Sequence, residues 1–445
     1  MSAGSRSYGS NVLVSVAAVG LMSAMALGNN VVIARAAGPE GRGVYGLAVA
    51  IGALALPIAS AGLGSATTWQ LGRGQPLGQL LALARRAISI TLAISLATAG
   101  VMHLGLGLAL GEATEWAVLA AALALPAQVI VEIGRGVALG RGRAVAYNLC
   151  SAAVIAVLLG LNSIAAVRGL PGTSWVVLNL VFANWAVALV LLCMTWGRLE
   201  PAAPPLVGDT LRYGARSAAV ALGDAALLRV DYLVAAPIIG LASLGVYAIA
   251  DQISHLMAWV GLLAGKMMLP EAAADDDDDA SRSLGKLALA CRLIVAVTLA
   301  GAAVAIALGP WLINALFGVA FADAYLALLI LLPATLSKSL HALVATWLQG
   351  RGDQRPIVRA SAIAIAVELL AVVVFALSFG WLGVAVAKAG AYVVQLGLSL
   401  AALRRHRSRL PDDDGHVIPG GRWLLDRSDL RTLQRWLAAR RRANP

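Results

Sequence analysis

Two similar stretches of the chain decide its architecture. Residues 34–50 read ARAAGPEGRGVYGLAVA, and residues 238–252 read IIGLASLGVYAIADQ. Five residues of the first stretch recur 202 positions later, so that Gly38, Gly43, Val44, Tyr45 and Ala48 correspond to Gly240, Gly245, Val246, Tyr247 and Ala250. Because this offset is nearly half of the 445-residue chain, it indicates an internal repeat of two large units.

The composition is that of a polytopic membrane protein. Hydrophobic residues make up 60% of the chain, charged residues only 13%, and the mean hydropathy is +0.82. A soluble protein carries about 25% charged residues. Apolar stretches of about 20 residues, each long enough to cross a bilayer, recur from end to end. They are continuous rather than alternating, which favours helices over barrel strands, and we expect an all-α protein.

The apolar stretches predict twelve transmembrane helices. They cover residues 11–34, 44–68, 87–110, 116–138, 144–166, 175–197, 214–238, 244–269, 287–309, 322–347, 357–379 and 381–403. The first stretch is followed by Ala34-Arg35-Ala36, which resembles a signal-peptidase site. Its apolar region is too long for a signal peptide, however, and we expect this helix to be retained.

The charge distribution predicts the orientation. The net charge is +11, and most Arg and Lys outside the helices lie in the even-numbered connections and the tails. Since cytoplasmic loops are enriched in positive charge, we expect both termini to be cytoplasmic. The odd-numbered connections are short, which argues against an extracytoplasmic catalytic domain such as that of a polymerase or ligase. We therefore expect no enzyme, and neither a P-loop nor a Cys/His cluster indicates a cofactor or metal.

The repeat predicts two lobes. Its copies lie after the first and the seventh predicted helix, so an even number of helices separates them and both lobes have the same orientation. We expect an N-terminal six-helix lobe (1–199), a Pro-rich cytoplasmic linker (200–209), a C-terminal six-helix lobe (210–403) and a basic tail (404–445). Two such lobes, related by a pseudo-twofold axis around a central cleft, are typical of alternating-access transporters.

The repeat sequences also resemble a known family. Residues 34–50, followed by GLGSATTWQLGRG (62–74), and residues 227–252, LLRVDYLVAAPIIGLASLGVYAIADQ, resemble the Wzx-type polysaccharide flippases. These belong to the multidrug/oligosaccharidyl-lipid/polysaccharide exporter superfamily. The resemblance implies a bacterial inner-membrane flippase of polyprenyl-pyrophosphate-linked oligosaccharide, serving lipopolysaccharide or exopolysaccharide synthesis. It is carried by the first, second, seventh and eighth helices.

Two alternatives within the superfamily stay open. A lipid II flippase resembles this chain but typically has two further helices, so twelve helices favour the oligosaccharide branch. An ion-coupled multidrug exporter would be expected to carry an acidic, aromatic cleft. Only 5% of the residues are aromatic and several embedded residues are cations, which disfavours the exporter. The sugar, the coupling ion and the oligomeric state are not predicted.

Ionisable and amide side chains within the helices are the candidates for substrate binding, because such residues are costly in a bilayer unless they serve a purpose. Arg229 leads the set, since a guanidinium matches a phosphate group. Asp251, His255 and Lys266 share one helix face, and Arg216, Asp224 and Asp231 lie within about 80° on another. The predicted substrate-binding set is Asn29, Asn30, Arg35, Arg216, Asp224, Arg229, Asp231, Asp251, His255 and Lys266.

Several of these residues also have a purely structural interpretation. Arg216 and Lys266 lie near helix ends, where long basic side chains reach the interface. Arg229 and Asp231 are also candidates for structural ion pairs, and a lone histidine such as His255 is commonly a packed, hydrogen-bonded residue. Glu132 and Arg135, three residues apart, are expected to form a structural pair.

Ion coupling has two candidates, Asp224 and Glu368. Glu368 lies near the middle of its predicted helix, where it is either a coupling carboxylate or a partner of Lys388 on the adjacent helix. Lys338 and His341 are embedded as well. Tyr45 and Tyr247, which follow the repeat glycines, are expected to shape the outer mouth.

Two charged segments lie outside the predicted helices. Asp275–Asp279 is expected to be a solvated loop rather than a metal or diphosphate site. In the tail, Leu430, Leu433, Trp436 and Leu437 share one face of a basic amphipathic helix, which suggests binding to anionic lipid. The expected partners are the lipid-linked substrate, the bilayer and, as a further hypothesis, a glycosyltransferase or polymerase of the same pathway; nucleic acid is not expected.

Overall fold

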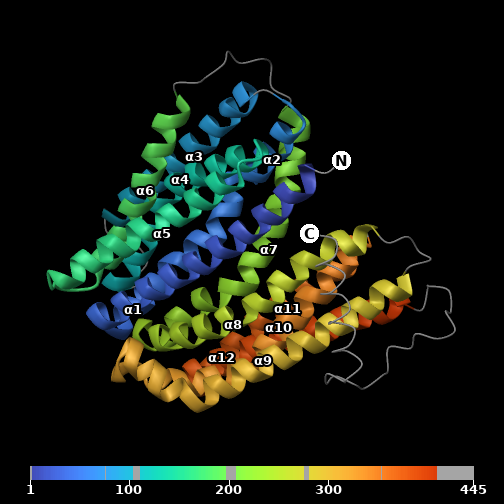
Figure 1. Cartoon of the computed structure of the whole chain (residues 1–445). Coiled ribbons are helices and arrows are strands. Elements are labelled where there is room, and N and C mark those ends of the chain that lie inside the picture. The colour runs from blue at the N-terminus through green and yellow to red at the C-terminus, as the bar shows by residue number, and fades with distance from the viewer. Residues whose placement is uncertain are drawn as a thin grey trace. The chain divides into compact units, whose positions relative to one another are not determined.

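The computed structural model describes residues 3–75, 77–103, 111–196, 207–274, 280–351 and 353–407. The described residues contain no strand and form helices joined by short connections (Figure 1). The helices are α1 (Ala3–Ser60), α2 (Leu63–Gly72), α3 (Leu77–His103), α4 (Glu112–Gly140), α5 (Ala144–Val167), α6 (Ser174–Trp196), α7 (Val207–Ile239), α8 (Leu241–Ala274), α9 (Ala280–Phe317), the 3-10 turn η2 (Val319–Phe321), α10 (Ala324–Gly350), α11 (Arg355–Phe379) and α12 (Trp381–Arg407).

These helices confirm the predicted all-α membrane fold. Among the described residues, nine helices are long and apolar enough to cross a membrane. One of them, Ala18–Ser60 within α1, covers the first predicted helix and most of the second. The two remaining predicted helices correspond to α7 and α8, which carry several charged residues. Within the described residues, helical structure is therefore present at each of the twelve predicted positions.

The structure divides into two compact units. Unit 1 comprises residues 1–248, 314–321 and 376–381, and unit 2 comprises residues 249–313, 322–375 and 382–445. The division falls inside α8, whereas the predicted lobes meet at the linker 200–209, so the predicted lobe boundaries stay a prediction. Most of that linker, the Asp275–Asp279 run and the amphipathic tail helix lie outside the described residues.

A single glycine separates the two helices at each copy of the repeat. Gly38 has φ 65° and ψ −167° within α1, and Gly240 has φ 78° between α7 and α8. L-residues with a side chain rarely adopt positive φ, so glycine is the residue that permits these breaks. The predicted connection of about ten residues between the first two helices is therefore wrong, since the second helical segment starts directly after Gly38.

The second predicted helix, 44–68, is not continuous. α1 ends at Ser60, and Ala61 (φ 46°) and Gly62 (φ 67°) both leave the helical conformation before α2 begins. A Cβ atom on Gly62 would lie 2.1 Å from the carbonyl oxygen of Gly214 in α7. The helix breaks at the point where its backbone contacts the backbone of α7. Because Gly214 lies about 150 residues away in the sequence, local periodicity could not predict this break.

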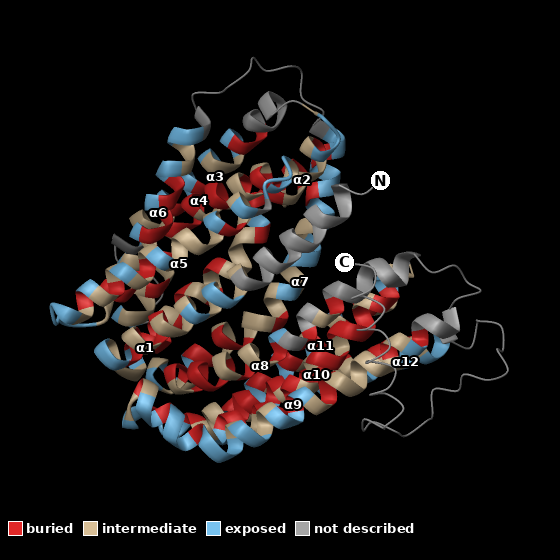
Figure 2. Cartoon of the chain, in the orientation of Figure 1, coloured by how far each residue is buried: buried red, intermediate tan, exposed pale blue. Residues whose placement is uncertain are grey.

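Unit 1 packs its helices around α1 and α4. α1 lies against α4, α5 and α7, while α4 also contacts α2, α3 and α6. Small residues permit this close packing, because alanine is the most frequent residue in the buried core of α4, for example Ala117, Ala120, Ala124 and Ala127. Figure 2 shows this core in red, with exposed residues on the outward faces. Apolar residues are common among those exposed side chains, as expected for a surface that meets lipid.

Unit 2 has its own core. Buried side chains of α9, α10, α11 and α12 form one apolar cluster, which includes Ile294, Leu343, Trp347 and Ile357. Gly261 of α8 approaches α10 so closely that a Cβ atom would lie 2.5 Å from the Ser339 Cβ. Close contact of α8 with α10 fixes the polar residues of α8 against those of the neighbouring helices.

Candidate functional site

The two copies of the repeat contact each other reciprocally in unit 1. A Cβ atom on Gly43 would lie 1.8 Å from the carbonyl oxygen of Leu241, and one on Gly245 would lie 1.9 Å from that of Pro39. Gly43 corresponds to Gly245 in the repeat, and Pro39 corresponds to Leu241. The same pair of repeat positions therefore meets twice, once in each direction. Such reciprocal contact is typical of two units related by a twofold axis. The sequence repeat is therefore a structural pseudo-twofold at this point.

Each repeat tyrosine is hydrogen-bonded to an equivalent position on the preceding helix. The Asn29 Nδ2 atom donates to the Tyr45 hydroxyl at 3.4 Å, and the Tyr247 hydroxyl donates to the Asp231 carboxylate. Asn29 and Asp231 are again 202 residues apart. A hydrogen bond that involves an ionised carboxylate is in general stronger than one that involves a neutral amide. Asp231 and Tyr247 are fully buried, and the role of the repeat tyrosines in shaping the outer mouth stays a prediction.

Asn29 also begins a chain of amides through unit 1. The Asn162 Nδ2 of α5 donates to Asn29 Oδ1 at 2.7 Å, and the Asn179 Nδ2 of α6 donates to Asn162 Oδ1 at 2.9 Å. Asn30, beside it, donates to the Ala26 carbonyl at 2.8 Å. Amides hydrogen-bonded across membrane helices hold the helices together. The structure thus gives Asn29 a packing role, and its binding of substrate stays a prediction.

Two arginines of unit 1 lie against tyrosine rings. The Arg42 side chain is only 5% exposed; its Nη2 lies 3.5 Å from the Ala248 carbonyl oxygen and its guanidinium 5.6 Å from the Tyr45 ring centre. The Arg229 guanidinium lies 5.2 Å from the Tyr232 ring centre, a cation–π geometry. The sequence predicts Arg229 as a site residue, whereas Arg42 falls in the connection predicted between the helices 11–34 and 44–68.

Arg35 caps the C-terminus of α9, whose last turn belongs to the same unit. Its Nε donates to the Leu316 carbonyl at 2.8 Å, and its Nη2 donates to the Ala315 carbonyl. These are carbonyls of the last turn of α9, which have no partner within the helix. A cation there also stabilises the negative end of the helix dipole. Arg35, a predicted substrate ligand, is therefore engaged in capping α9 in this structure.

In unit 2, four ionisable side chains from three helices form a continuous chain. The Lys388 Nζ of α12 lies 3.0 Å from Asp251 Oδ1, and the His255 Nδ1 lies 3.2 Å from the same oxygen. The Lys338 Nζ of α10 lies 2.8 Å from His255 Nε2 and 3.2 Å from the Tyr392 hydroxyl. An ammonium group only donates, so Nε2 accepts and the imidazole proton resides on Nδ1, toward Asp251.

This basic chain, Lys338–His255–Asp251–Lys388, is buried to different degrees. Lys388 is fully buried and Asp251 is 1% exposed, whereas Lys338 is partly exposed. A buried ammonium needs an opposite charge, and Asp251 supplies one for Lys388. Lys338 contacts a histidine and a tyrosine and is the more exposed of the two lysines. Lys338 and Lys388 were recognised from sequence as embedded but not as partners of Asp251 and His255.

Glu368 and His341 extend the polar interior of unit 2. Glu368 of α11 is fully buried, and the His341 Nδ1 lies 2.8 Å from the Ser399 hydroxyl. Lys388 contacts Asp251, and the pairing of Glu368 with Lys388 stays a prediction. The role of Glu368 in ion coupling stays a prediction.

The remaining predicted residues are spread over different surroundings. Arg216 and Asp224 of α7 are exposed, whereas Asp231 is fully buried, and binding of substrate by the three residues stays a prediction. The backbone of Lys266 lies in α8, and its side chain is outside the described set. Glu132 and Arg135 form the expected pair at 3.2 Å, and Arg135 also donates to the Tyr147 hydroxyl at 2.7 Å.

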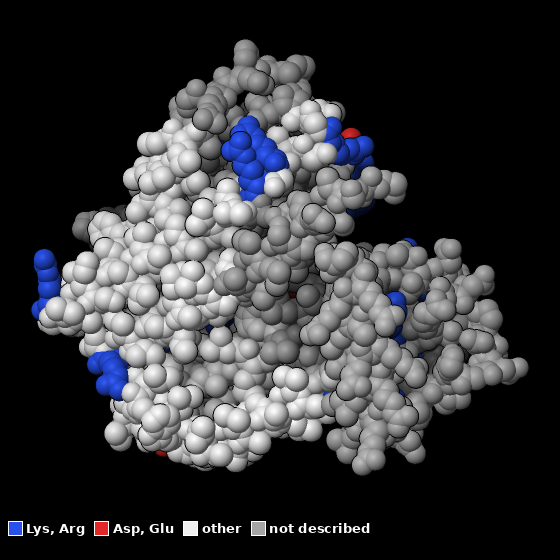
Figure 3. Space-filling model, in the orientation of Figure 1, with Lys and Arg blue, Asp and Glu red and all other residues white. Residues whose placement is uncertain are grey.

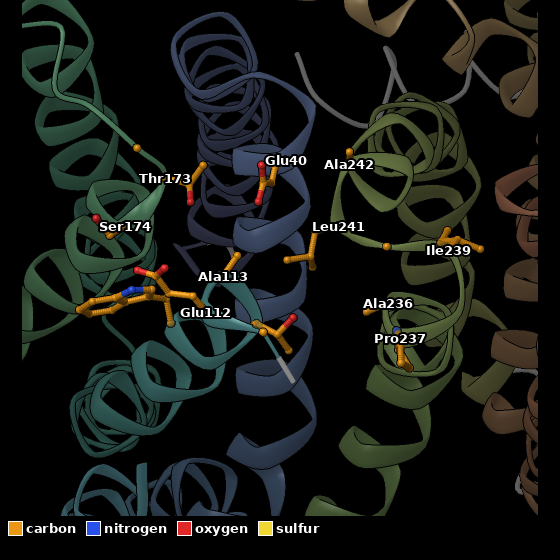
Figure 4. A pocket seen from close by; sticks show the side chains of 15 residues that line it. Glu40, Glu112, Ala113, Thr173, Ser174, Ala236, Pro237, Ile239, Leu241 and Ala242 are labelled. Carbon is orange, nitrogen blue, oxygen red and sulfur yellow. The ribbon is translucent and has the colours of Figure 1, made fainter. Parts of the chain in front are cut away.

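A cavity of about 930 Å³ opens in unit 1 where the odd-numbered predicted connections meet (Figure 4). Figure 4 shows Glu40, Glu112 and Thr173 around it, each from a different part of the chain, with Leu241 beside them. Away from this cavity, the end of α2 contacts the start of α7. Gln70 of α2 donates to Thr210 of α7 at 2.8 Å, and Trp69 stacks on Tyr213. The alternation of connections between two faces, assumed in the topology, is therefore present in unit 1.

Nothing in the described part of the chain suggests a metal centre, since no group of three or more His, Cys, Asp or Glu side chains is placed to hold an ion there. The three cysteines are free thiols.

Comparison with known proteins shows which solved structures have a similar fold. No protein-family model matches the chain, and none of the curated proteins matches its sequence. Solved structures do match: an inward-facing multidrug resistance MATE family transporter of the MOP superfamily is similar with a TM-score of 0.69 and 18% identity, over 88% of this chain and 96% of that one. The lipid II flippase MurJ in an inward closed conformation is similar with a TM-score of 0.72 and 11% identity, over 88% and 87%.

A third structure belongs to the same superfamily. It is a MOP superfamily transporter from Pyrococcus furiosus, for which a binding pocket of reverse polarity suggests a different function; its TM-score is 0.52 at 13% identity, over 88% of this chain and 94% of that one. The chain therefore has the fold of the MOP superfamily transporters and is a multi-pass membrane protein. These structural neighbours are transporters and flippases, not enzymes.

Proposed function

We propose that this protein is a flippase that carries a polyprenyl-pyrophosphate-linked oligosaccharide across the bacterial cytoplasmic membrane by alternating access, for the synthesis of a cell-surface polysaccharide. The observation that supports this most is the basic chain of unit 2, found in a fold shared with a lipid II flippase. A diphosphate that enters a membrane protein needs cations and hydrogen-bond donors that are shielded from bulk water. Lys338, with His255 and the Tyr392 hydroxyl beside it, offers both.

Arg229 and Arg42 supply the corresponding charge in unit 1. The Arg42 guanidinium lies against the ring of the repeat tyrosine Tyr45 and the Arg229 guanidinium against that of Tyr232, and a guanidinium presents several donors in a planar arrangement that suits phosphate. Arg42 is nearly buried, so Arg229 is the better candidate for contact with a head group. No covalent chemistry is needed, and the driving force is an ion gradient, the membrane potential or consumption of the product outside.

The second candidate is a flippase of a lipid II-type peptidoglycan precursor. The similarity to MurJ favours it, and its substrate has the same polyprenyl diphosphate with a different sugar. A lipid II flippase typically has two helices more than the twelve predicted for this chain, so the predicted number of helices favours the oligosaccharide. Export of organic cations is the remaining alternative, and the two glutamates of the 930 Å³ cavity are the feature that suits it.

Proteoliposomes test the proposal with three variants. Lys338→Met and Arg229→Ala remove the proposed phosphate contacts, and Arg168→Ala removes an exposed arginine at the end of α5 as a matched control. We expect translocation of a fluorescent polyprenyl-diphosphate oligosaccharide to fall at least tenfold in the first two variants and to persist in the control. Equal transport in all three would remove the phosphate role from these residues. Efflux of organic cations without flipping would overturn the proposal.

A further inference from the structure

A second cavity lies on the opposite half of unit 1 and is unlike the first. It is a groove of about 530 Å³ formed by the C-terminal half of α4, the first half of α5 and the last turns of α6. The side chains described along it are Gly, Ala, Val, Leu, Cys and Met, with two exceptions, Arg141 and Arg143. Both arginines lie at one end, in the turn between α4 and α5.

The groove is open along its length. Its floor contains Ala138 and Val187, each 8% exposed, whereas Leu149, Val190 and Met194 along its rim are 63%, 58% and 68% exposed. Exposed apolar side chains on membrane helices face lipid chains rather than water. In Figure 3 the described part of the visible surface is mostly uncharged, and Lys and Arg atoms gather in a few places. The groove is therefore one that a hydrocarbon chain can enter from the bilayer.

Its length matches one leaflet. From Ala146 to Val157 the lining of α5 extends over eleven residues, or about 16 Å at 1.5 Å per residue. The hydrocarbon core of a bilayer is about 30 Å thick, so one leaflet is about 15 Å deep. A single acyl chain that starts at the arginine end reaches the bilayer centre at the other end of the groove.

The arginine end is suited to a phosphate. Arg141 and Arg143 are exposed and flank Gly142, whose φ of 70° forms the tight turn. Within the described residues neither arginine has an acidic partner, in contrast to Arg135 one turn earlier, which pairs with Glu132. α5 starts at Ala144 without a side-chain cap, so its first amide groups add positive potential at the same place. Basic pockets between membrane helices bind anionic lipid head groups.

We propose that this groove binds one anionic glycerophospholipid, with its phosphate on Arg141 and Arg143 and one acyl chain along α4, α5 and α6. The site is separate from the basic chain of unit 2 and does not depend on which cargo the protein carries. Zwitterionic lipid has the same chains but no net charge, so charge at the α4–α5 turn is what selects the lipid. A bound lipid at this place would join the ends of three helices of unit 1.

Cys150 provides a reporter inside the groove. It is one of the lining residues, whereas Cys193 and Cys291 are not. In the full-length protein with Cys193→Ser and Cys291→Ser, we expect phosphatidylglycerol to slow maleimide labelling of Cys150 at least fivefold, and phosphatidylcholine to have little effect. Arg141→Gln with Arg143→Gln is expected to abolish the difference. Arg85→Gln with Arg86→Gln, which removes the same charge from α3, is expected to keep it.

Mass spectrometry of the intact protein gives a second measurement that does not depend on the thiol. It is expected to show one phosphatidylglycerol retained by the control and lost from the Arg141/Arg143 variant and from Ala153→Phe, which fills the groove. Equal protection by both lipids, or protection that survives the loss of both arginines, would overturn the proposal. Protection by a polyprenyl phosphate but not by phosphatidylglycerol would also overturn it, since the groove would then belong to the cargo.

Discussion

Gly43 and Gly245 face each other across a pseudo-twofold axis in unit 1, so closely that a Cβ atom on Gly245 would lie 3.0 Å from the amide nitrogen of Gly43. Each glycine also packs on the carbonyl oxygen of the residue that starts the other helical segment, Leu241 or Pro39. The repeat in the sequence is thus explained by contact: both copies need a residue without a side chain at the same crossing.

Replacing either glycine by alanine is expected to destabilise the protein. Overpacking a close contact costs about 1–3 kcal/mol, and here the obstructing atoms are backbone carbonyls that cannot rotate away. Thermal unfolding in detergent should show Gly43→Ala and Gly245→Ala both unfolding several degrees below the wild type. Gly160→Ala in α5, where a Cβ atom meets nothing within 4 Å, is the control. Wild-type stability of both repeat variants would mean that the crossing is not tight.

The two repeat tyrosines are expected to differ in importance. Tyr247→Phe removes the hydroxyl donor from the fully buried Asp231 carboxylate, and a hydrogen bond to a charged group contributes about 1.5–3 kcal/mol. Tyr45→Phe removes only a 3.4 Å contact from an amide that has another partner, Asn162. Chemical denaturation should therefore show a larger loss for Tyr247→Phe. A larger loss for Tyr45→Phe would contradict this account of the pair.

The Asp251–Lys388 pair is expected to behave as a buried ion pair. Removing one partner of a buried ion pair costs about 3–5 kcal/mol, whereas removing both is much less harmful. Asp251→Asn and Lys388→Met should each lower the free energy of unfolding strongly, and the double variant should recover most of the loss. A double-mutant cycle measures this coupling. Additive effects of the two substitutions would show that the contact carries no interaction energy.

The orientation of the chain can be tested at the two ends of unit 1. In a protein without its native cysteines, Glu112→Cys at the 930 Å³ cavity and Arg141→Cys at the α4–α5 turn are the reporters. An impermeant maleimide added to intact cells should label the first position, and the second only after the membrane is opened. Labelling of both from outside would contradict the topology, and the reverse pattern would place the termini outside.

The sequence was most informative where structure is local. Apolar stretches located the helices, and the repeat located the pseudo-twofold, because both depend on residue type and spacing. The Asp251–His255 contact follows in the same way, since the two residues are one helical turn apart.

Contacts between distant helices could not be predicted from local patterns. Lys338 and Lys388 meet the α8 residues only through packing of α10 and α12, which no local pattern encodes. Arg42 was assigned to a loop because nothing in the sequence shows that Gly38 alone makes the turn. The break at Ala61–Gly62 likewise depends on Gly214 of α7.

Translocation of the lipid-linked head group by the wild-type protein tests the central claim most directly. Purified protein is reconstituted with a fluorescent polyprenyl-diphosphate oligosaccharide, and an impermeant quencher or a head-group-modifying enzyme outside the vesicles reports arrival in the outer leaflet. The account predicts exchange between leaflets much faster than in protein-free vesicles, reduced by Lys338→Met. Exchange at the protein-free rate, in vesicles where the same preparation moves organic cations, would contradict it.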